Sequence, residues 1–177
     1  MPNYRRRFQP GGCWFFTVNL RDRRMSLLTD NIDLLREAIA QTKRRLPFRI
    51  DAFVVLPDHL HAIWTLPPDD ADFSTRWRLI KTRFAKALPK NETDQMRLRR
   101  GERGIWQRRF WEHLVRDEND FARCLEYCAI NPVKHRFVRR VVDWPYSSFH
   151  RDVRRGIFSE NWGTDVALIG DFGERPE

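Results

Sequence analysis

The segment from Ile50 to Leu66 constrains the fold most strongly, because it has the pattern of two apolar strands joined by a tight turn. Pro57 and Asp58 interrupt the run, and both residues favour turns over strand interiors. The second strand would open with His59 and His61. Side chains two positions apart on a strand point to the same face, with Cα atoms about 6.5 Å apart, so both imidazoles can converge on one ion or phosphate. Taken alone, the pattern somewhat favours a chance pair on a half-buried strand.

The charge balance indicates a polyanionic partner. The 177 residues include 33 Lys and Arg against 24 Asp and Glu, which gives a net charge of +9. Most of the basic residues are arginine, whose planar fork suits phosphate oxygens and stacks on bases. Nucleic acid therefore fits better than a membrane surface as the partner.

Other whole-chain features favour a soluble protein of the cytoplasm. No apolar stretch approaches the roughly 20 residues that a membrane-spanning helix needs, and the N-terminus lacks the pattern of an export signal. Three cysteines without zinc-like spacing favour reduced thiols. The length suits one domain over 1–177, with a core of about 4–135 and a C-terminal extension over 136–177.

The order of expected elements predicts an α+β fold. Further strands are expected at 13–20 and within 105–116, and helices at about 29–46, 72–88 and 117–132. This order matches a ferredoxin-like or RRM-like sandwich, an antiparallel sheet with helices on one face, here followed by a C-terminal helical tail. The fold alone names no activity.

Several basic and aromatic residues are predicted to contact nucleic acid. The helix at 72–88 carries five basic residues with no acidic partner between Arg76 and Lys86, although a solvated face is the usual explanation of such charge. The segment 105–116 alternates aromatic and basic residues, which suits either base stacking or an edge strand with its aromatic side chains inward. The predicted contacts are Arg5, Arg6, Arg7, Arg76, Lys81, Arg83, Arg108, Arg109, Trp111 and Lys134.

The helix expected after Asp117 places a phenol and an amide on one side. Tyr127 and Asn131 are four residues apart, so their side chains emerge one turn from each other. His113 and His135 are expected to be phosphate or structural contacts. Asp58 is expected to be a turn residue, with support of a histidine as the alternative.

Two separated motifs resemble a known family. They are Leu56-Pro-Asp-His-Leu-His-Ala-Ile-Trp64 and Tyr127-Cys-Ala-Ile-Asn-Pro-Val-Lys-His135. Together with Gly104–His113 and Asp143–Ser148 they resemble the single-tyrosine HUH transposases, and most closely the REP-associated tyrosine transposases. The similarity runs from about Tyr4 to Phe158.

The resemblance implies a reaction and a set of residues. His59, His61 and Asn131 would bind a divalent metal, Mg²⁺ or Mn²⁺, and Tyr127 would attack DNA to leave a 5′-phosphotyrosine and a free 3′-hydroxyl. The implied partner is single-stranded or hairpin DNA of REP type, bound by a monomer or homodimer at the bacterial nucleoid. Paired imidazoles ordinarily favour zinc, copper, iron or nickel over magnesium, but the amide oxygen of Asn131 is a hard ligand. We expect a DNA phosphate to complete the metal's coordination.

A non-catalytic module that binds single-stranded nucleic acid is the alternative function, because the RRM has the same architecture. An RRM presents aromatic side chains on its central strands. Here the corresponding strand offers His59 and His61, and binding alone does not explain the spacing of Tyr127 and Asn131.

Overall fold

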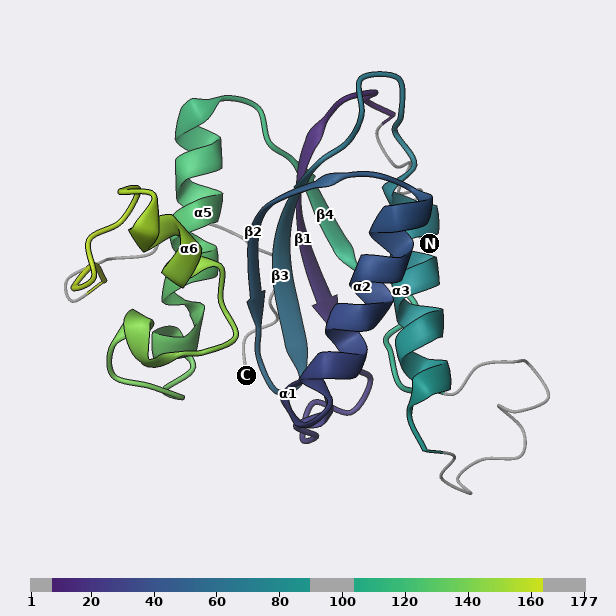
Figure 1. Cartoon of the computed structure of the whole chain (residues 1–177), viewed down its shortest axis with the longest axis horizontal. Helices are drawn as coiled ribbons and strands as arrows, with labels where there is room; N and C mark the ends of the chain where they lie inside the picture. Colours follow the sequence, from purple (N-terminus) through teal and green to yellow (C-terminus); the bar gives the residue numbers. More distant parts are fainter. Residues whose placement is uncertain (1–7, 90–103, 164–177) are drawn as a thin grey trace, which may run out of the picture.

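Figure 1 shows the computed structural model, which describes residues 8–89 and 104–163. The strands are β1 (Cys13–Asn19), β2 (Arg49–Val55), β3 (His59–Thr65) and β4 (Trp111–Leu114). The helices are α1 (Leu27–Asp30), α2 (Ile32–Arg45), α3 (Phe73–Ala87), α5 (Glu118–Lys134), the 3₁₀ helix η1 (Val141–Asp143) and α6 (Phe149–Arg154). The predicted α+β class is confirmed.

The four strands form one antiparallel sheet in the order β2-β3-β1-β4. This order is that of a ferredoxin-like sandwich. The inner position of β3 gives both of its histidines partners on β1, since His59 pairs with Asn19 and His61 with Thr17. The histidine pair is therefore held by backbone hydrogen bonds on both sides of its strand.

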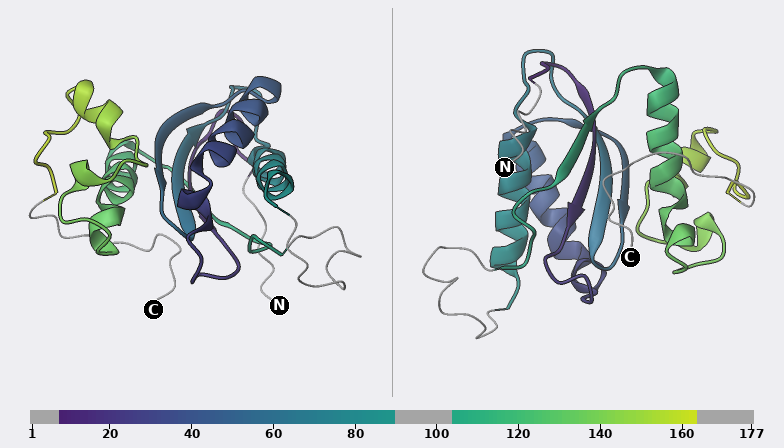
Figure 2. Two further views of the ribbon diagram at one scale, coloured as in Figure 1. Left: turned by 60° about the horizontal axis from the view of Figure 1, so that its bottom comes forward. Right: turned by 180° about the vertical axis from the view of Figure 1, so that it is seen from behind.

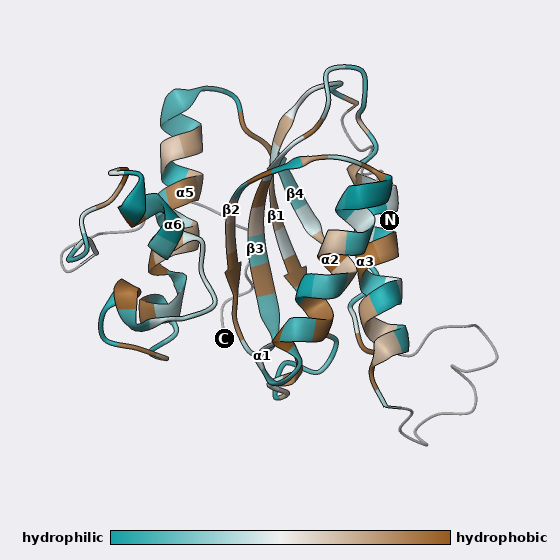
Figure 3. Ribbon diagram, viewed as in Figure 1, coloured by the Kyte–Doolittle hydropathy of each residue, from teal (hydrophilic) through white to brown (hydrophobic). Residues whose placement is uncertain are grey.

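Helices α2 and α3 cover one face of the sheet (Figures 1 and 2). Alternate residues of β1 and β3 meet the apolar stripe of α3, and the rings of Trp64 and Trp77 stack with centroids 4.1 Å apart. Asp72 caps α3, because its side chain accepts a hydrogen bond from the Thr75 backbone N–H at 2.8 Å. Figure 3 shows apolar residues along the strands and on the sheet-facing turns of these helices.

Helix α5 packs against the opposite face, which is the face that carries the histidines. Its buried residues include Cys124, Tyr127 and Cys128, which contact Phe15 and Val54 in a second core. The expected arrangement of helices on one face thus describes α2 and α3, whereas α5 encloses the other side.

The boundaries of two elements differ from the expected ones. Helix α5 continues through Pro132 to Lys134, because the N–H of His135 donates to the carbonyl of Asn131 at 3.0 Å and closes the last turn. The last strand is limited to Trp111–Leu114, and Trp106 forms an isolated bridge with Leu20 instead. The segment before β4 therefore lies beside the end of β1.

The part that follows α5 packs on that helix and on the edge of β2. Val141, Phe149 and Phe158 form a third apolar cluster with Ile130 of α5. The Val55 N–H donates to the Tyr146 carbonyl at 2.9 Å, which attaches this part to the sheet. Among the described residues, no helix has the length and apolarity required to cross a bilayer.

Candidate active site

The two histidines of β3 lie together in the space between the sheet and α5. His59 is 1% exposed and His61 is 0% exposed, and their ring centroids are 5.1 Å apart. Leu60, between them, points into the core under α2 and α3. The expected convergence of side chains two residues apart is therefore present.

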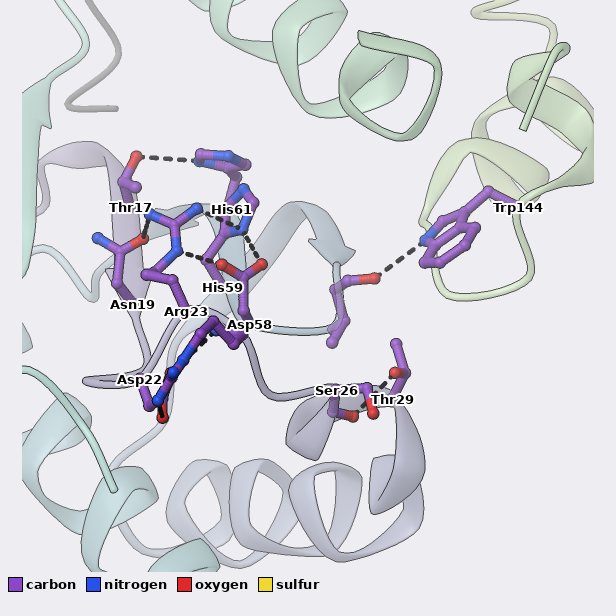
Figure 4. Close-up of polar contacts among 12 residues, drawn as sticks. Thr17, Asn19, Asp22, Arg23, Ser26, Thr29, Asp58, His59, His61 and Trp144 are labelled. Carbon is purple, nitrogen blue, oxygen red and sulfur yellow. Dashed lines mark hydrogen bonds and ion pairs between the residues drawn. The ribbon is translucent and has the colours of Figure 1, made fainter. Parts of the chain in front are cut away.

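Hydrogen bonds fix the orientation of both rings (Figure 4). The Nδ1 atom of His59 lies 2.7 Å from an oxygen of Asp58, and the Nδ1 atom of His61 lies 2.9 Å from the hydroxyl of Thr17. Because an ionised carboxylate only accepts, the contact with Asp58 requires a proton on Nδ1 of His59, which leaves Nε2 to face a ligand. The guanidinium of Arg23 lies 3.3 Å from the same Nδ1. Asp58 thus has a larger role than the turn residue expected from the sequence.

Asp58 also forms an ion pair with Arg23, which extends the network to the loop after β1. Burial by itself raises the pKa of Asp58, but the hydrogen bonds and charges of His59 and Arg23 outweigh burial and hold the pKa below its usual value. Arg23 also donates to the side chain of Asn19 at 3.2 Å. Neither Thr17 nor Arg23 was predicted from the sequence to support the site.

Tyr127 brings its ring to the histidines from α5. The ring centroid lies 5.1 Å from that of His61 in an edge-on arrangement, and the side chain is 2% exposed. The hydroxyl accepts a hydrogen bond from the amine of Lys134 at 2.7 Å, and the amine lies 4.7 Å from the ring centroid. The structure therefore places a cation on the phenolic oxygen.

Asn131 lies on the same side of α5, between two residues that reach the histidines. Tyr127 is one turn before it, beside His61, and His135 is one turn after it, with its ring 5.0 Å from that of His59. Since residues four apart share a helix side, the fully buried Asn131 belongs to the row that faces the pair. His135, which was expected to be a phosphate or structural contact, is thus a neighbour of the histidine pair.

These residues fit a divalent metal by the chemistry of their donor atoms. Two imidazole nitrogens and one amide oxygen supply neutral ligands, and the carboxylate of Asp58 on Nδ1 of His59 is the support commonly found behind metal-binding histidines.

The structure corrects one of the predicted nucleic-acid contacts. Arg76 is 1% exposed, and its guanidinium is bound entirely within the protein. It donates to the carbonyls of Leu46, Pro47 and Asp72 and pairs with Asp70 at 2.7 Å. Arg76 therefore anchors α3 to the loops around it and does not present its charge to DNA.

The other predicted contacts differ in how far they reach the surface. Lys81 donates to the Gln107 carbonyl at 2.5 Å, and Arg83 to the Thr42 hydroxyl at 2.5 Å, so both are half-buried ties between elements. Arg108 and Arg109 are exposed, whereas the ring of Trp111 is half-buried against Phe15, with centroids 5.8 Å apart. Arg5, Arg6 and Arg7 lie outside the described residues.

A groove of about 830 Å³ lies between α3 and the segment before β4. Its basic residues are Arg21, Arg78, Lys81, Lys86 and Arg108, and none of the described residues that line it is acidic. The Gln107 N–H donates to the Asn19 carbonyl at 3.0 Å, and Asn19 pairs with His59. The groove therefore reaches the end of the sheet where the histidines are.

A second cluster of possible metal ligands, formed by His113, Asp120 and Cys124, is explained by hydrogen bonding. Asp120 accepts from His113 at 2.8 Å and from the Arg116 backbone at 2.9 Å, and it pairs with Arg123. Burial raises the pKa of Asp120, but these donors outweigh it and lower the pKa to about 2. Since burial raises the pKa of Cys124 to about 12, its thiol stays protonated at neutral pH. This cluster joins β4 to α5.

The chain is similar over its whole length to proteins of one family. An Escherichia coli (strain K12) protein named REP-associated tyrosine transposase is 51% identical over 99% of this chain and 98% of its own length. A Haemophilus influenzae protein named putative REP-associated tyrosine transposase is 49% identical over 97% of this chain and 99% of its own length. The chain matches no protein-family model.

A solved structure agrees with these relatives. A REP-associated tyrosine transposase bound to a REP hairpin superposes with a TM-score of 0.86 at 49% identity, covering 100% of this chain and 99% of that one. The class of protein is thus the one that the sequence resembles, a tyrosine transposase with a ferredoxin-like core. The chain belongs to the REP-associated tyrosine transposase family.

Proposed function

We propose that this protein is a DNA strand transferase that cleaves and rejoins single-stranded or hairpin DNA of REP type through a 5′-phosphotyrosine. The family and the REP hairpin bound by the solved relative support the substrate class. The observation that carries the reaction is the position of Tyr127, whose ring lies 5.1 Å from that of His61 while Lys134 contacts its hydroxyl.

In the proposed step the hydroxyl oxygen of Tyr127 attacks the scissile phosphorus. A bond forms between that oxygen and phosphorus, and the bond from phosphorus to the 3′ oxygen breaks. The phenol loses its proton and the departing 3′ oxygen gains one, so the products are a 5′-phosphotyrosine and a 3′-hydroxyl. The phosphodiester energy is retained in the covalent intermediate, and attack by a 3′-hydroxyl rejoins the strand without ATP.

Lys134 is assigned the role of holding and stabilising the phenolic oxygen. A free phenol is mostly protonated at neutral pH because its pKa is about 10. An ammonium at 2.7 Å favours the negative charge that develops on the oxygen as the proton leaves. Lys134 is also a predicted DNA contact, and a phosphate at the phenol would lie within reach of the same amine.

His59, His61 and Asn131 would hold a divalent metal, Mg²⁺ or Mn²⁺, supported by Asp58 and Thr17 behind the imidazoles. Such an ion supplies charge that polarises a phosphate and stabilises a departing oxygen. Because its protein ligands are neutral, we expect weak binding without DNA and tighter binding with it. Calorimetric titration of Mn²⁺ into the Tyr127→Phe protein measures both states, and tight binding in the absence of DNA would contradict the proposed ligand set.

The basic groove is the proposed binding surface for the DNA backbone. Arg78, Lys86 and Arg108 line it, Arg109 is exposed nearby in the chain, and Arg5, Arg6 and Arg7 are further proposed contacts. Lys81 also lines the groove. Arg83 and Trp111 are kept as proposed contacts outside it, since Arg83 donates to Thr42 of α2 and Trp111 packs against Phe15 on the α5 side of the sheet. Binding through these charges would weaken steeply with salt.

Tyr127 lies beside the histidines of its own chain, so the proposed site is complete in one copy. This position supports cleavage by a monomer that uses its own Tyr127, and a homodimer is the alternative. We propose that the protein acts in the bacterial cytoplasm, at the nucleoid, because the proposed substrate is DNA.

The experiment that separates a transferase from a binding module is detection of a covalent protein–DNA product. Labelled hairpin oligonucleotides are incubated with the protein and Mn²⁺ or Mg²⁺ and resolved under denaturing conditions. We expect a shifted band that Tyr127→Phe abolishes and that the matched variant Tyr146→Phe retains. Absence of the band with the unaltered protein, despite salt-sensitive binding, would favour the non-catalytic module.

A further inference from the structure

A row of aromatic rings leads from the histidine site to the protein surface. The ring of His135 lies 5.0 Å from that of His59 and 6.2 Å from that of Phe137. Phe137 in turn stacks on Trp144, with centroids 5.4 Å apart and planes inclined by 29°. We name His135, Phe137 and Trp144 the aromatic shelf.

The outer member of the aromatic shelf is exposed although it is a large apolar side chain. Phe137 keeps 44% of its surface accessible. One face of its ring lies against the Trp144 indole, whose N–H is fixed on the Val55 carbonyl at 2.9 Å (Figure 4). Trp144 thus holds one face of the Phe137 ring in place in the absence of DNA, and the accessible surface of Phe137 lies away from that face.

Arg136, between His135 and Phe137, has a backbone conformation that is unfavourable for arginine. Arg136 has φ of 60°, in the left-handed region, at the position after the helix cap where glycine is usual. The N–H groups of Arg136 and Phe137 donate to the carbonyls of Val133 and Pro132 at 2.9 Å each, which is the Schellman pattern of helix termination. Any residue with a Cβ is strained there, so capping alone does not favour arginine.

The surroundings of the aromatic shelf are basic. Lys134, Arg136 and Arg139 are exposed, and Arg140 is exposed but paired with Asp143 at 3.8 Å. Aromatic rings beside positive charges are the combination that binds single-stranded nucleic acid, because bases stack on the rings while phosphates meet the charges.

We propose that the aromatic shelf stacks an unpaired base of the DNA strand next to the scissile phosphate, with Arg136 on the neighbouring backbone phosphate. This proposal rests on the proposed function, since His135 of the aromatic shelf lies beside His59 of the proposed active site. It names a subsite for the single-stranded flank of a hairpin, whereas the basic groove serves the backbone on the other face of the sheet. A hydrophobic contact that only closes the helix end would be buried, and Phe137 is not.

The test measures stacking directly and needs no cleavage. Hairpins with a single-stranded tail on the 5′ or the 3′ side carry 2-aminopurine at the first unpaired position, and each is titrated into full-length Tyr127→Phe protein. We expect fluorescence quenching with one of the two tails. Phe137→Leu should remove most of that quenching and weaken binding roughly tenfold, since base–aromatic stacking is worth about one to two powers of ten in affinity.

Matched variants distinguish stacking from loss of bulk. Phe137→Tyr should retain the quenching, and Ile157→Ala, which alters an exposed apolar side chain elsewhere, should change neither quenching nor affinity. A blunt hairpin should bind the Phe137→Leu protein as well as it binds the parent. If the Phe137→Leu protein bound tailed hairpins with the same affinity and quenching as the parent protein, the subsite would be overturned. A covalent product on Tyr127 in the cleavage assay would still support the proposed function.

The variant Arg136→Gly distinguishes a role of Arg136 in ending the helix from a role in binding DNA. Glycine removes the strain at φ of 60°, so the thermal midpoint should rise. Binding of the tailed hairpin should weaken, and the slope of log affinity against log salt should fall by about 0.7, the value for one phosphate contact on a single strand. A higher midpoint with unchanged binding and salt slope would assign Arg136 to capping alone and overturn its part of the proposal.

Discussion

Removal of the cation on the catalytic oxygen is predicted to slow cleavage by about tenfold. The amine of Lys134 donates to the Tyr127 hydroxyl at 2.7 Å, and a hydrogen bond to a charged group is worth about 1.5–3 kcal/mol. Because Lys134 is exposed, water screens part of this energy, and we take about 1.5 kcal/mol. A loss of about 1.4 kcal/mol in the transition state corresponds to a tenfold lower rate.

The assay is the single-turnover rate of covalent product formation with Lys134→Met, whose side chain keeps most of the length without the charge. Lys43→Met is the matched control, because Lys43 is exposed at the end of α2 on the other side of the sheet. At saturating DNA the measured rate does not depend on affinity. If Lys134 acted only in DNA binding, Lys134→Met would therefore not change the rate under these conditions. A Lys134→Met rate within twofold of the parent at saturation would refute the assigned role.

Three further predictions concern the supports of the fold and site. Arg76→Leu should lower the free energy of unfolding, measured by urea titration, by about 3–5 kcal/mol, because it leaves buried carbonyls and Asp70 unpaired. Substitution of the exposed Arg78 by alanine should change this free energy by less than about 0.5 kcal/mol, and equal effects of the two variants would contradict the role of Arg76 as a buried anchor. Asp58→Asn should weaken Mn²⁺ binding to the DNA complex roughly 10- to 100-fold by calorimetry, and unchanged affinity would exclude its support of His59. Asp120→Asn should destabilise the protein by about 2 kcal/mol at neutral pH, because the pKa of Asp120 in the folded protein, about 2, lies below the usual 3.8. The stabilisation by ionised Asp120 is present above about pH 4 and disappears as the pH falls through about 2. A stability difference between the two proteins that does not change with pH would contradict this prediction.

The sequence was sufficient for the features that follow from local periodicity. The alternation in β3 placed His59 and His61 on one face, and the four-residue spacing of Tyr127 and Asn131 placed them on one side of a helix. These inferences hold because strand and helix geometry fix side-chain direction over a few residues. The ferredoxin-like topology was predicted from the order of the strands and helices along the chain, and the observed strand order agrees with it.

Features that depend on distant elements were not visible in the sequence. Arg76 looked like one of several basic residues on a helix, but its partners include carbonyls about 30 residues away, so only the packed chain shows its burial. Support of a histidine by Asp58 was the less favoured of two predicted roles, and its ion pair with Arg23, in the loop after β1, was not predicted. One signal was present, since Lys134 follows Tyr127 by seven positions, which is nearly two helical turns and places both on one side of the helix.

The most direct test of the central claim is identification of the residue that carries DNA after cleavage. The covalent product is digested with nuclease and protease, and mass spectrometry locates the remaining nucleotide on a peptide. The chain has three tyrosines, Tyr4, Tyr127 and Tyr146. We predict a nucleotide joined through its 5′ phosphate to Tyr127, and a nucleotide on Tyr4 or Tyr146 would contradict the assignment of the site.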